Sequence, residues 1–116
     1  MPRDTEHILQ RQCVTWFRYQ FPLLDPLLFA IPNGGGRSKA TAGRLKAEGV
    51  KAGVSDLFLS VARKGVHGLF VEMKAISGRQ SGHQKAFEQR VCAEGYGYVV
   101  IRSLEDFQHT ITDYLK

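Results

Sequence analysis

The sequence predicts an α/β fold in which a small mixed β-sheet is flanked by helices. Helical and strand patterns follow one another in the order α-β-α-β-β-α-β-α, and two neighbouring apolar segments have the spacing of a hairpin. Ser, Gly and Pro residues stand at the expected element boundaries. The 116 residues, of which 43% are hydrophobic, are enough for one domain with a core, so we expect residues 1–116 to form a single domain.

A first helix is predicted near the N-terminus, where Asp4 or Thr5 can act as its N-cap. Its apolar face has roughly helical spacing and predicts core packing; it consists of Leu9, Cys13, Val14, Trp16 and Phe17. Glu6 and Gln10 lie four residues apart and so share one side of this helix. Glu6 has two interpretations, a favourable charge at a helix N-terminus or a carboxylate that reaches a site on the strands.

A short apolar segment, residues 27–31, predicts a brief strand that Pro32 ends. A glycine-rich run follows, with Asn33, Gly34, Gly35, Gly36 and Arg37 in order. Glycine backbones can approach a phosphate closely, although the spacing fits neither a P-loop nor a dinucleotide-binding fingerprint. A flexible turn and a nucleic-acid contact are both consistent with this run.

A second helix is predicted over residues 39–48, capped by Ser38 and ended by Gly49. It has few apolar residues, so one face must lie in water. Its basic side chains, with one just beyond its end, are Lys39, Arg44, Lys46 and Lys51. This face is either simply solvated or a surface that follows a DNA backbone, and the nearby glycine-rich run favours the second interpretation.

The next two apolar segments, residues 56–61 and 68–74, predict the strands of an antiparallel hairpin joined by a short charged link. A turn centred near Lys64 places Asp56 opposite Glu72, and the period of two puts Lys74 on the same face as Glu72. Two neighbouring carboxylates repel each other unless a positive charge separates them, and Mg²⁺ prefers such oxygen ligands. The alternative is that these polar residues at strand ends simply face water.

The last part of the chain predicts a loop over residues 75–80, a helix over 81–94, a strand over 98–102 and a final helix that Ser103 starts. Ser81 and Gln84 form the S-x-x-Q capping-box pattern, which alone can explain Gln84. The final helix has one apolar face, made by Leu104, Phe107, Ile111 and Leu115.

Composition restricts the classes of protein. The net charge of +5 and a pI near 9.5 suit a polyanionic partner. We expect both cysteines, Cys13 and Cys92, to be buried free thiols, because their spacing fits no metal site. Long apolar stretches and a signal-peptide pattern are absent from the sequence, so we expect no membrane contact and a cytoplasmic location, in a bacterial cell or a phage-infected host.

Three motifs together resemble the PD-(D/E)XK nuclease superfamily, and more narrowly its VRR-NUC family: Gly53-Val54-Ser55-Asp56-Leu57, Glu72-Met73-Lys74 and Ser81-Gly82-His83-Gln84. Glu6 with Gln10, the run Ile31-Pro32-Asn33-Gly34-Gly35 and the pair Gly95-Tyr96 add to the resemblance, which extends from about residue 6 to residue 115. It implies a restriction-endonuclease-like core. Ser55 stands where the superfamily has proline, which leaves the stiffness of the approach to Asp56 in question.

The resemblance also implies roles for single residues. Asp56, Glu72 and the backbone carbonyl of Met73 match the family's metal ligands, and Glu6 matches the acid that completes the site. Lys74 matches the lysine that orients or activates the attacking water, and Gln84 the glutamine that supports the site from the next helix.

A nuclease of this kind is implied to use Mg²⁺ or Mn²⁺ and no organic cofactor, and to cut branched DNA such as four-way (Holliday) junctions as a homodimer in replication, repair or recombination, leaving 5′-phosphates. Two alternatives remain open. One is a non-catalytic nucleic-acid-binding module that retains the fold, and the other is a basic RNA-binding accessory protein.

Overall fold

The structure is a computed structural model that describes residues 2–32 and 38–116, with side chains from residue 5 onward. Its elements in chain order are α1 (Pro2–Gln20), a short 3-10 helix η1 (Asp25–Leu27), β1 (Leu28–Ala30), α2 (Lys39–Ala47), β2 (Leu57–Leu59), β3 (Leu69–Met73), α3 (Gly82–Ala93), β4 (Gly97–Ile101) and α4 (Leu104–Leu115). The predicted α/β fold and order of elements are therefore confirmed. None of the described helices combines the length and the apolar character that crossing a bilayer requires.

The four strands form one mixed sheet in the order β1-β2-β3-β4. β2 pairs with β1 and with β3 in antiparallel directions, whereas β4 lies parallel to β3. A parallel pair needs a crossover connection, which α3 supplies. Lys64 and Gly65 both have positive φ, at 56° and 80°, in the tight turn between β2 and β3, as the predicted hairpin requires.

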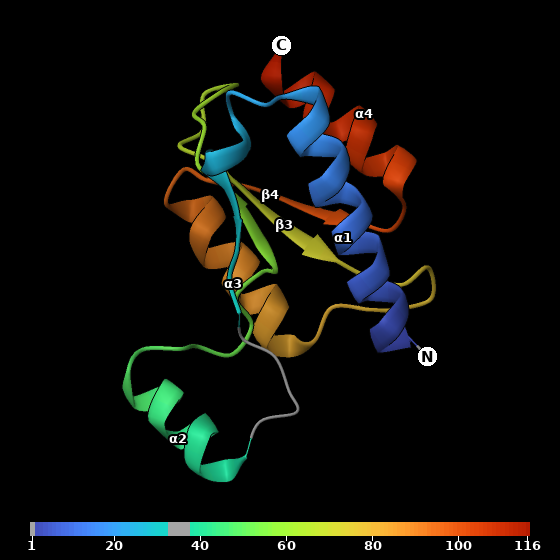
Figure 1. The fold of residues 1–116 in the computed structure, drawn as a ribbon. Coiled ribbons are helices and arrows are strands. Elements are labelled where there is room, and N and C mark those ends of the chain that lie inside the picture. Colours follow the sequence, from blue (N-terminus) through green and yellow to red (C-terminus); the bar gives the residue numbers. More distant parts are fainter. Residues whose placement is uncertain (1, 33–37) are drawn as a thin grey trace.

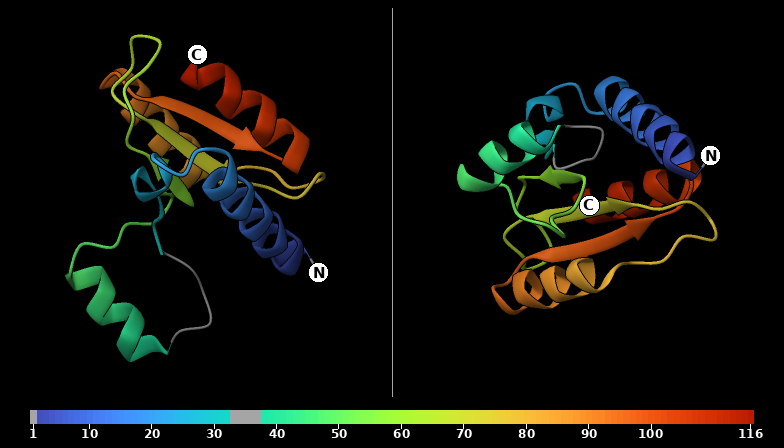
Figure 2. Two further views of the ribbon diagram at one scale, coloured as in Figure 1. Left: turned by 45° about the horizontal axis from the view of Figure 1, so that its top comes forward. Right: turned by 90° about the horizontal axis from the view of Figure 1, so that it is seen from below.

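Helices cover the two faces of the sheet unequally. α1 and α4 lie together on one face and α3 lies on the other (Figure 1 and Figure 2). The core forms where α1 and α4 meet the sheet, and its fully buried apolar side chains include Phe17, Leu57, Val71, Ile101 and Phe107. β3 is central, with Leu69, Val71, Glu72 and Met73 all buried.

The face that α3 covers is aromatic. Phe70 of β3 packs against Phe58 of β2, with ring centroids 4.5 Å apart, and edge-on against Phe87 of α3 at 5.1 Å. Tyr96 also contacts Phe70, at 5.5 Å. Because side chains alternate along β3, Glu72 and Phe70 share this face, so the aromatic cluster borders the predicted carboxylate pair.

The structure corrects three local predictions. The first helix begins at Pro2, so neither Asp4 nor Thr5 is its N-cap; proline suits the first helical turn because its missing N–H would have no partner there. The last strand begins one residue earlier than predicted and ends at Ile101. Cys13 is buried and free as predicted, but Cys92 is free and exposed.

The second helix, α2, lies apart from the layers (Figure 1). Ser38 accepts a hydrogen bond from the backbone N–H of Thr41, and Gly49 leaves the helix with a φ of 109°. The predicted start and the Ser38 cap are confirmed, whereas the helix ends at Ala47, one residue earlier than predicted. Within the described part of the chain no residue of α2 is buried, which agrees with its low apolar content.

Candidate active site

Asp56 enters the site from the residue before β2. The pairing of Leu57 with Val71 brings Asp56 to the level of Glu72, as the predicted hairpin requires. Its Oδ2 accepts a hydrogen bond of 2.7 Å from the backbone N–H of Met73. Its own carbonyl accepts one of 2.8 Å from the N–H of Ile31. Asp56 is therefore held from both neighbouring strands.

Ser55, which precedes Asp56, takes the place of the proline that the motif would lead one to expect. Ser55 is fully buried, and its hydroxyl donates to the carbonyl of Leu57 at 3.3 Å. A side-chain bond to the backbone two residues on restrains the local chain, as a proline ring would by another means.

Glu72 is the buried carboxylate of the site, with 3% of its surface exposed. Its Oε2 accepts a hydrogen bond of 3.0 Å from the amide of Gln84, whereas its Oε1 is buried and has no hydrogen-bond partner among the described residues. Burial, next the negative charge of Asp56, and then a side-chain hydrogen bond between the two carboxyl groups raise the pKa of Glu72 from 4.5 to about 8. A buried acceptor without a donor is costly, which is why such groups mark functional sites.

Lys74 lies on the same face of β3 as Glu72, as the alternation of side chains predicts. Its Nζ is 4.0 Å from Oε2 of Glu72, and only 13% of its side chain is exposed. The positive charge of Lys74 lowers the pKa of Glu72, but this effect is smaller than that of burial and of Asp56. The ammonium is thus the positive group next to the carboxylate pair.

Gln84 makes two kinds of contact from the first turn of α3. Its Oε1 accepts from the backbone N–H of Ser81 at 2.8 Å, while the Ser81 hydroxyl accepts from the N–H of Gln84, which completes the predicted capping box. Its Nε2 donates to Glu72. The capping interpretation and the supporting interpretation of Gln84 are therefore compatible, since different atoms of one amide serve them.

Glu6 reaches the edge of the site from α1. Its Oε2 accepts a hydrogen bond of 3.2 Å from the backbone N–H of Ala75, the residue after Lys74. Its negative charge also raises the pKa of Glu72, as the weakest of the causes. Glu6 therefore lies close to the carboxylate pair rather than serving only the start of its helix.

The fit of a divalent cation can be tested on these residues. Among residues 5–32 and 38–116 no group of three or more His, Cys, Asp or Glu side chains converges tightly enough to form a metal site. The carboxyl groups of Asp56 and Glu72 do converge, and Mg²⁺ needs only one or two protein carboxylates because it retains several waters. The donor set of Asp56 and Glu72 thus fits a hydrated Mg²⁺ or Mn²⁺, with Glu6 at its edge.

The predicted nucleic-acid contacts fall into two groups. Asn33, Gly34, Gly35 and Arg37 lie outside the described residues. Lys39, Arg44, Lys46 and Lys51 are all exposed on or just after α2. A Cβ on Gly53, whose φ is 89°, would lie 2.4 Å from the carbonyl oxygen of His83, so the chain between α2 and Asp56 passes directly against the start of α3.

The contacts of two side chains, Arg102 and Gln80, were not predicted from the sequence. The guanidinium of Arg102 donates to the carbonyls of Ala75 and Gly78, at 2.8 and 2.7 Å. The amide of Gln80 donates to Glu88 at 3.0 Å and to the hydroxyl of Tyr98 at 3.2 Å. Burial is the main reason that the pKa of Tyr98 rises to about 12. These contacts hold the segment between β3 and α3. No local sequence pattern predicts them, because the partners are distant in sequence.

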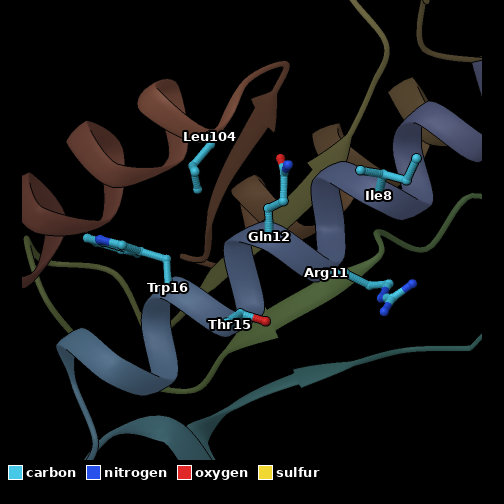
Figure 3. A pocket seen from close by; sticks show the side chains of 6 residues that line it. All are labelled: Ile8, Arg11, Gln12, Thr15, Trp16 and Leu104. Carbon is cyan, nitrogen blue, oxygen red and sulfur yellow. The ribbon is translucent and has the colours of Figure 1, made fainter.

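A groove of about 450 Å³ lies elsewhere on the molecule, where α1 meets the start of α4 (Figure 3). Its lining residues are Ile8, Arg11, Gln12, Thr15, Trp16 and Leu104. None of the candidate site residues lines it. The chemistry is therefore assigned to the carboxylate pair and not to this groove.

Comparison with solved structures found a chain described as "VRR_NUC domain protein", which superposes with a TM-score of 0.83 at 28% sequence identity. The match covers 96% of this chain and 88% of that chain. No protein-family model matches the chain, and no curated protein matches it. The likeness confirms both the α/β fold and the resemblance inferred from the motifs, and it supports a nuclease-type function.

Proposed function

We propose, from a fold shared with a VRR-NUC domain protein, that this chain is a single-domain, divalent-metal-dependent DNA endonuclease that hydrolyses phosphodiester bonds in branched DNA. The observation that carries the proposal is the environment of Glu72: its buried Oε1 receives no hydrogen bond from a donor group of the described residues, the carboxyl group of Asp56 lies beside it, and Nζ of Lys74 is 4.0 Å from its Oε2. A purely structural carboxylate in the core would have its acceptors satisfied. A cation-binding carboxylate keeps one oxygen available.

In this proposal Asp56 and Glu72 would hold the cation, the carbonyl of Met73 would be a third ligand, and Glu6 would lie at the edge of the site. When bound, Mg²⁺ or Mn²⁺ supplies a Lewis acid for a phosphoryl oxygen and lowers the pKa of a bound water. The chain contributes the positions of its ligands. The N–H of Met73 orients Asp56, and the amide of Gln84 orients Glu72, so neither carboxylate must reorganise.

Lys74 is the proposed catalytic cation of the chain itself. Its ammonium lies on the site face of β3, 4.0 Å from Glu72, where it can hold the attacking water and offset the negative charge that develops on the phosphate. Its low exposure, 13% of the side chain, strengthens this electrostatic effect because little water screens it.

The substrate is proposed to be held through its backbone. The exposed cations Lys39, Arg44, Lys46 and Lys51 follow a glycine-rich segment that includes Asn33, Gly34, Gly35 and Arg37, and phosphate contacts of this kind do not read sequence. The cut is therefore expected to depend on DNA structure. A homodimer would present two sites, as the cutting of two strands at a four-way junction requires.

The same proposal places the enzyme in DNA replication, repair or recombination, in the cytoplasm of a bacterial cell or a phage-infected host. A cleavage panel tests it directly. Four-way junctions, flaps, nicked duplexes and single strands of one sequence are incubated with Mg²⁺ or Mn²⁺. The wild type is expected to cut branched DNA fastest, and Glu72→Ala to cut none. Metal-independent binding without cleavage by the wild type would instead favour a non-catalytic DNA-binding module.

A further inference from the structure

The segment that follows Lys74 is ordered by one guanidinium. Nη1 of Arg102 donates to the backbone carbonyls of Ala75 at 2.8 Å, Ile76 at 3.2 Å and Gly78 at 2.7 Å. Arg102 follows the last residue of β4, which lies parallel beside β3, so the topology brings its side chain to the chain that leaves β3. Hydrogen bonds from a charged donor are stronger than neutral ones, and here the two N–H groups of Nη1 are shared among three carbonyls of one short segment.

Other contacts tie the same segment to the candidate site. The N–H of Ala75 donates to Glu6 at 3.2 Å, and the N–H of Gly78 donates back to the carbonyl of Ala75 at 2.9 Å, which closes a turn. A Cβ on Gly78 would lie 3.6 Å from Cδ of Lys74, so the turn lies against the stem of the lysine. The turn is thus fixed relative to the ammonium.

Ile76 stands at this turn with 84% of its surface exposed. Exposure of a single apolar side chain is common and means little by itself. Leu23 is even more exposed, at 92%, in the segment between α1 and η1. Ile76 differs from Leu23 because its own carbonyl is held by Arg102 and because it lies two residues after Lys74. The backbone at Ile76 is therefore restrained close to Lys74, while its apolar, β-branched side chain lies in water.

We infer that Ile76 contacts an unstacked base at the branch point of the DNA and so contributes to the structure selectivity of the enzyme, with Arg102 as its positioning residue. The inference rests on the proposed function. Apolar side chains inserted at base steps stabilise unstacked DNA, at a cost of a few kcal/mol in an intact duplex. Stacking is already interrupted at a branch point, so Ile76 meets less resistance there than in linear DNA.

The test uses a four-way junction that carries 2-aminopurine at the branch point, with Ca²⁺ in place of Mg²⁺ so that binding is measured apart from cleavage. The fluorescence of 2-aminopurine rises when the base unstacks. The wild type is expected to raise it at saturation. Ile76→Ala is expected to give less than one fifth of this increase, while the control Leu23→Ala gives the full increase. In Mg²⁺, the ratio of cleavage rates on junction and nicked duplex is expected to fall at least fivefold in Ile76→Ala.

Arg102 is tested by two further variants. Arg102→Ala is expected to lose the fluorescence response although Ile76 is still present, and Arg102→Lys to recover part of it, because an ammonium can bond some of the carbonyls. Thermal melts check that each variant is folded. Should both Arg102 variants fail to fold, the Ile76→Ala variant alone tests the proposed base contact. The Ile76 side chain is exposed, so its removal leaves the core intact.

The outcomes separate the two proposals. A wild type that cuts branched DNA without a fluorescence response, or an Ile76→Ala variant that keeps both the response and the cleavage ratio, overturns the role of Ile76. A wild type that gives the response, loses it in Ile76→Ala and yet cuts no DNA with Mg²⁺ or Mn²⁺ overturns the nuclease proposal and leaves the contact standing. A wild type that neither cuts nor responds overturns both.

Discussion

At the scale of single residues, Glu72 is central to the proposed chemistry because its two carboxylate oxygens have different surroundings. One carboxylate oxygen is bonded to Gln84, and the other is buried without a partner among the described residues. Burial raises its pKa most, the neighbouring carboxylate of Asp56 raises it further, and Lys74 offsets these effects only in part. Ionising Glu72 in this arrangement is costly, and a bound cation, like the proton that Glu72 holds without metal, relieves the repulsion between the two carboxyl groups, which is the reason to expect a cation there.

The pH dependence of stability follows from this residue. In a metal-free buffer the folded chain holds a proton on Glu72 up to about pH 8, whereas an unfolded chain loses it near pH 4.5. The folded state therefore binds more protons in this window, and the contribution of Glu72 to stability falls as the pH rises from about 4.5 to 8. Glu72→Gln cannot titrate, so its melting temperature should exceed that of the wild type by a margin that widens with pH. Thermal melts between pH 5 and 8 measure it, and a constant margin would contradict the burial of an ionisable Glu72.

Lys74 provides a second test at this scale. Lys74→Ala is expected to abolish cleavage while largely preserving DNA affinity, because one partly buried ammonium contributes to the reaction more than to backbone binding. Single-turnover cleavage and fluorescence anisotropy separate the two effects. Lys64→Asn is the matched control, since Lys64 is exposed in the β2–β3 turn and asparagine tolerates its positive φ. Equal loss of cleavage and affinity in a folded Lys74→Ala variant would make Lys74 a backbone anchor instead.

The elements of the fold differ in how far the sequence predicts them. The hairpin register was predictable because the period of two and a tight turn at Lys64 leave one pairing that buries the apolar side chains. The capped start of α3 was predictable from Ser81 and Gln84, which lie three residues apart. Both signals are local.

Other features of the elements depend on distant partners and were not predictable. Arg102 bonds to residues 24 to 27 positions earlier, and Gly53 meets His83 across the site. The start of α1 was predicted wrongly because Asp4 and Thr5, which are common N-cap residue types, were preferred to a helix that begins at Pro2. The exposure of Cys92 was missed because the apolar side of α3 is weakly marked, and in the described structure no residue of α3 is buried.

The capping box of α3 allows its two functions to be separated. Ser81→Ala removes the bond to the N–H of Gln84 and is expected to cost about 1 kcal/mol of stability with little effect on cleavage. Gln84→Ala removes its own part of the cap and also the bond to Glu72, so it should cost a similar amount of stability and reduce cleavage at least tenfold. Chemical denaturation and single-turnover rates measure the pair. A Gln84→Ala variant as active as Ser81→Ala would leave Gln84 with a capping role alone.

At the scale of the whole molecule, the sheet with α1, α3 and α4 forms the frame of the site, and α2 projects from this frame (Figure 2). The cations of α2 are exposed. The net charge of +5 is thus partly concentrated on an element that contributes no buried residue to the described structure. An element that is not needed for the core and carries several cations suits the binding of a polyanion.

Salt dependence tests this division between frame and α2. Each lost phosphate contact should reduce the slope of log affinity against log salt concentration by about 1. The double variant Arg44→Ala with Lys46→Ala is therefore expected to reduce the slope by about 2 and to weaken all DNA substrates alike. Lys64→Asn with Lys116→Ala removes the same charge elsewhere on the surface. Anisotropy titrations from 50 to 200 mM salt measure both, and equal slopes for the two variants would mean that α2 makes no specific backbone contacts.

The most direct test of the central claim is the binding of Mn²⁺ to the protein alone, measured by calorimetry. The wild type should bind Mn²⁺ at a site that Asp56→Asn and Glu72→Gln each remove, whereas Glu105→Gln, an exposed acid in the first turn of α4, should bind like the wild type. Glutamine and asparagine keep the size of the side chains, so the loss would report the carboxylates themselves. Undiminished Mn²⁺ binding by a folded Glu72→Gln variant, or none by the wild type, would contradict a cation held between these two strands.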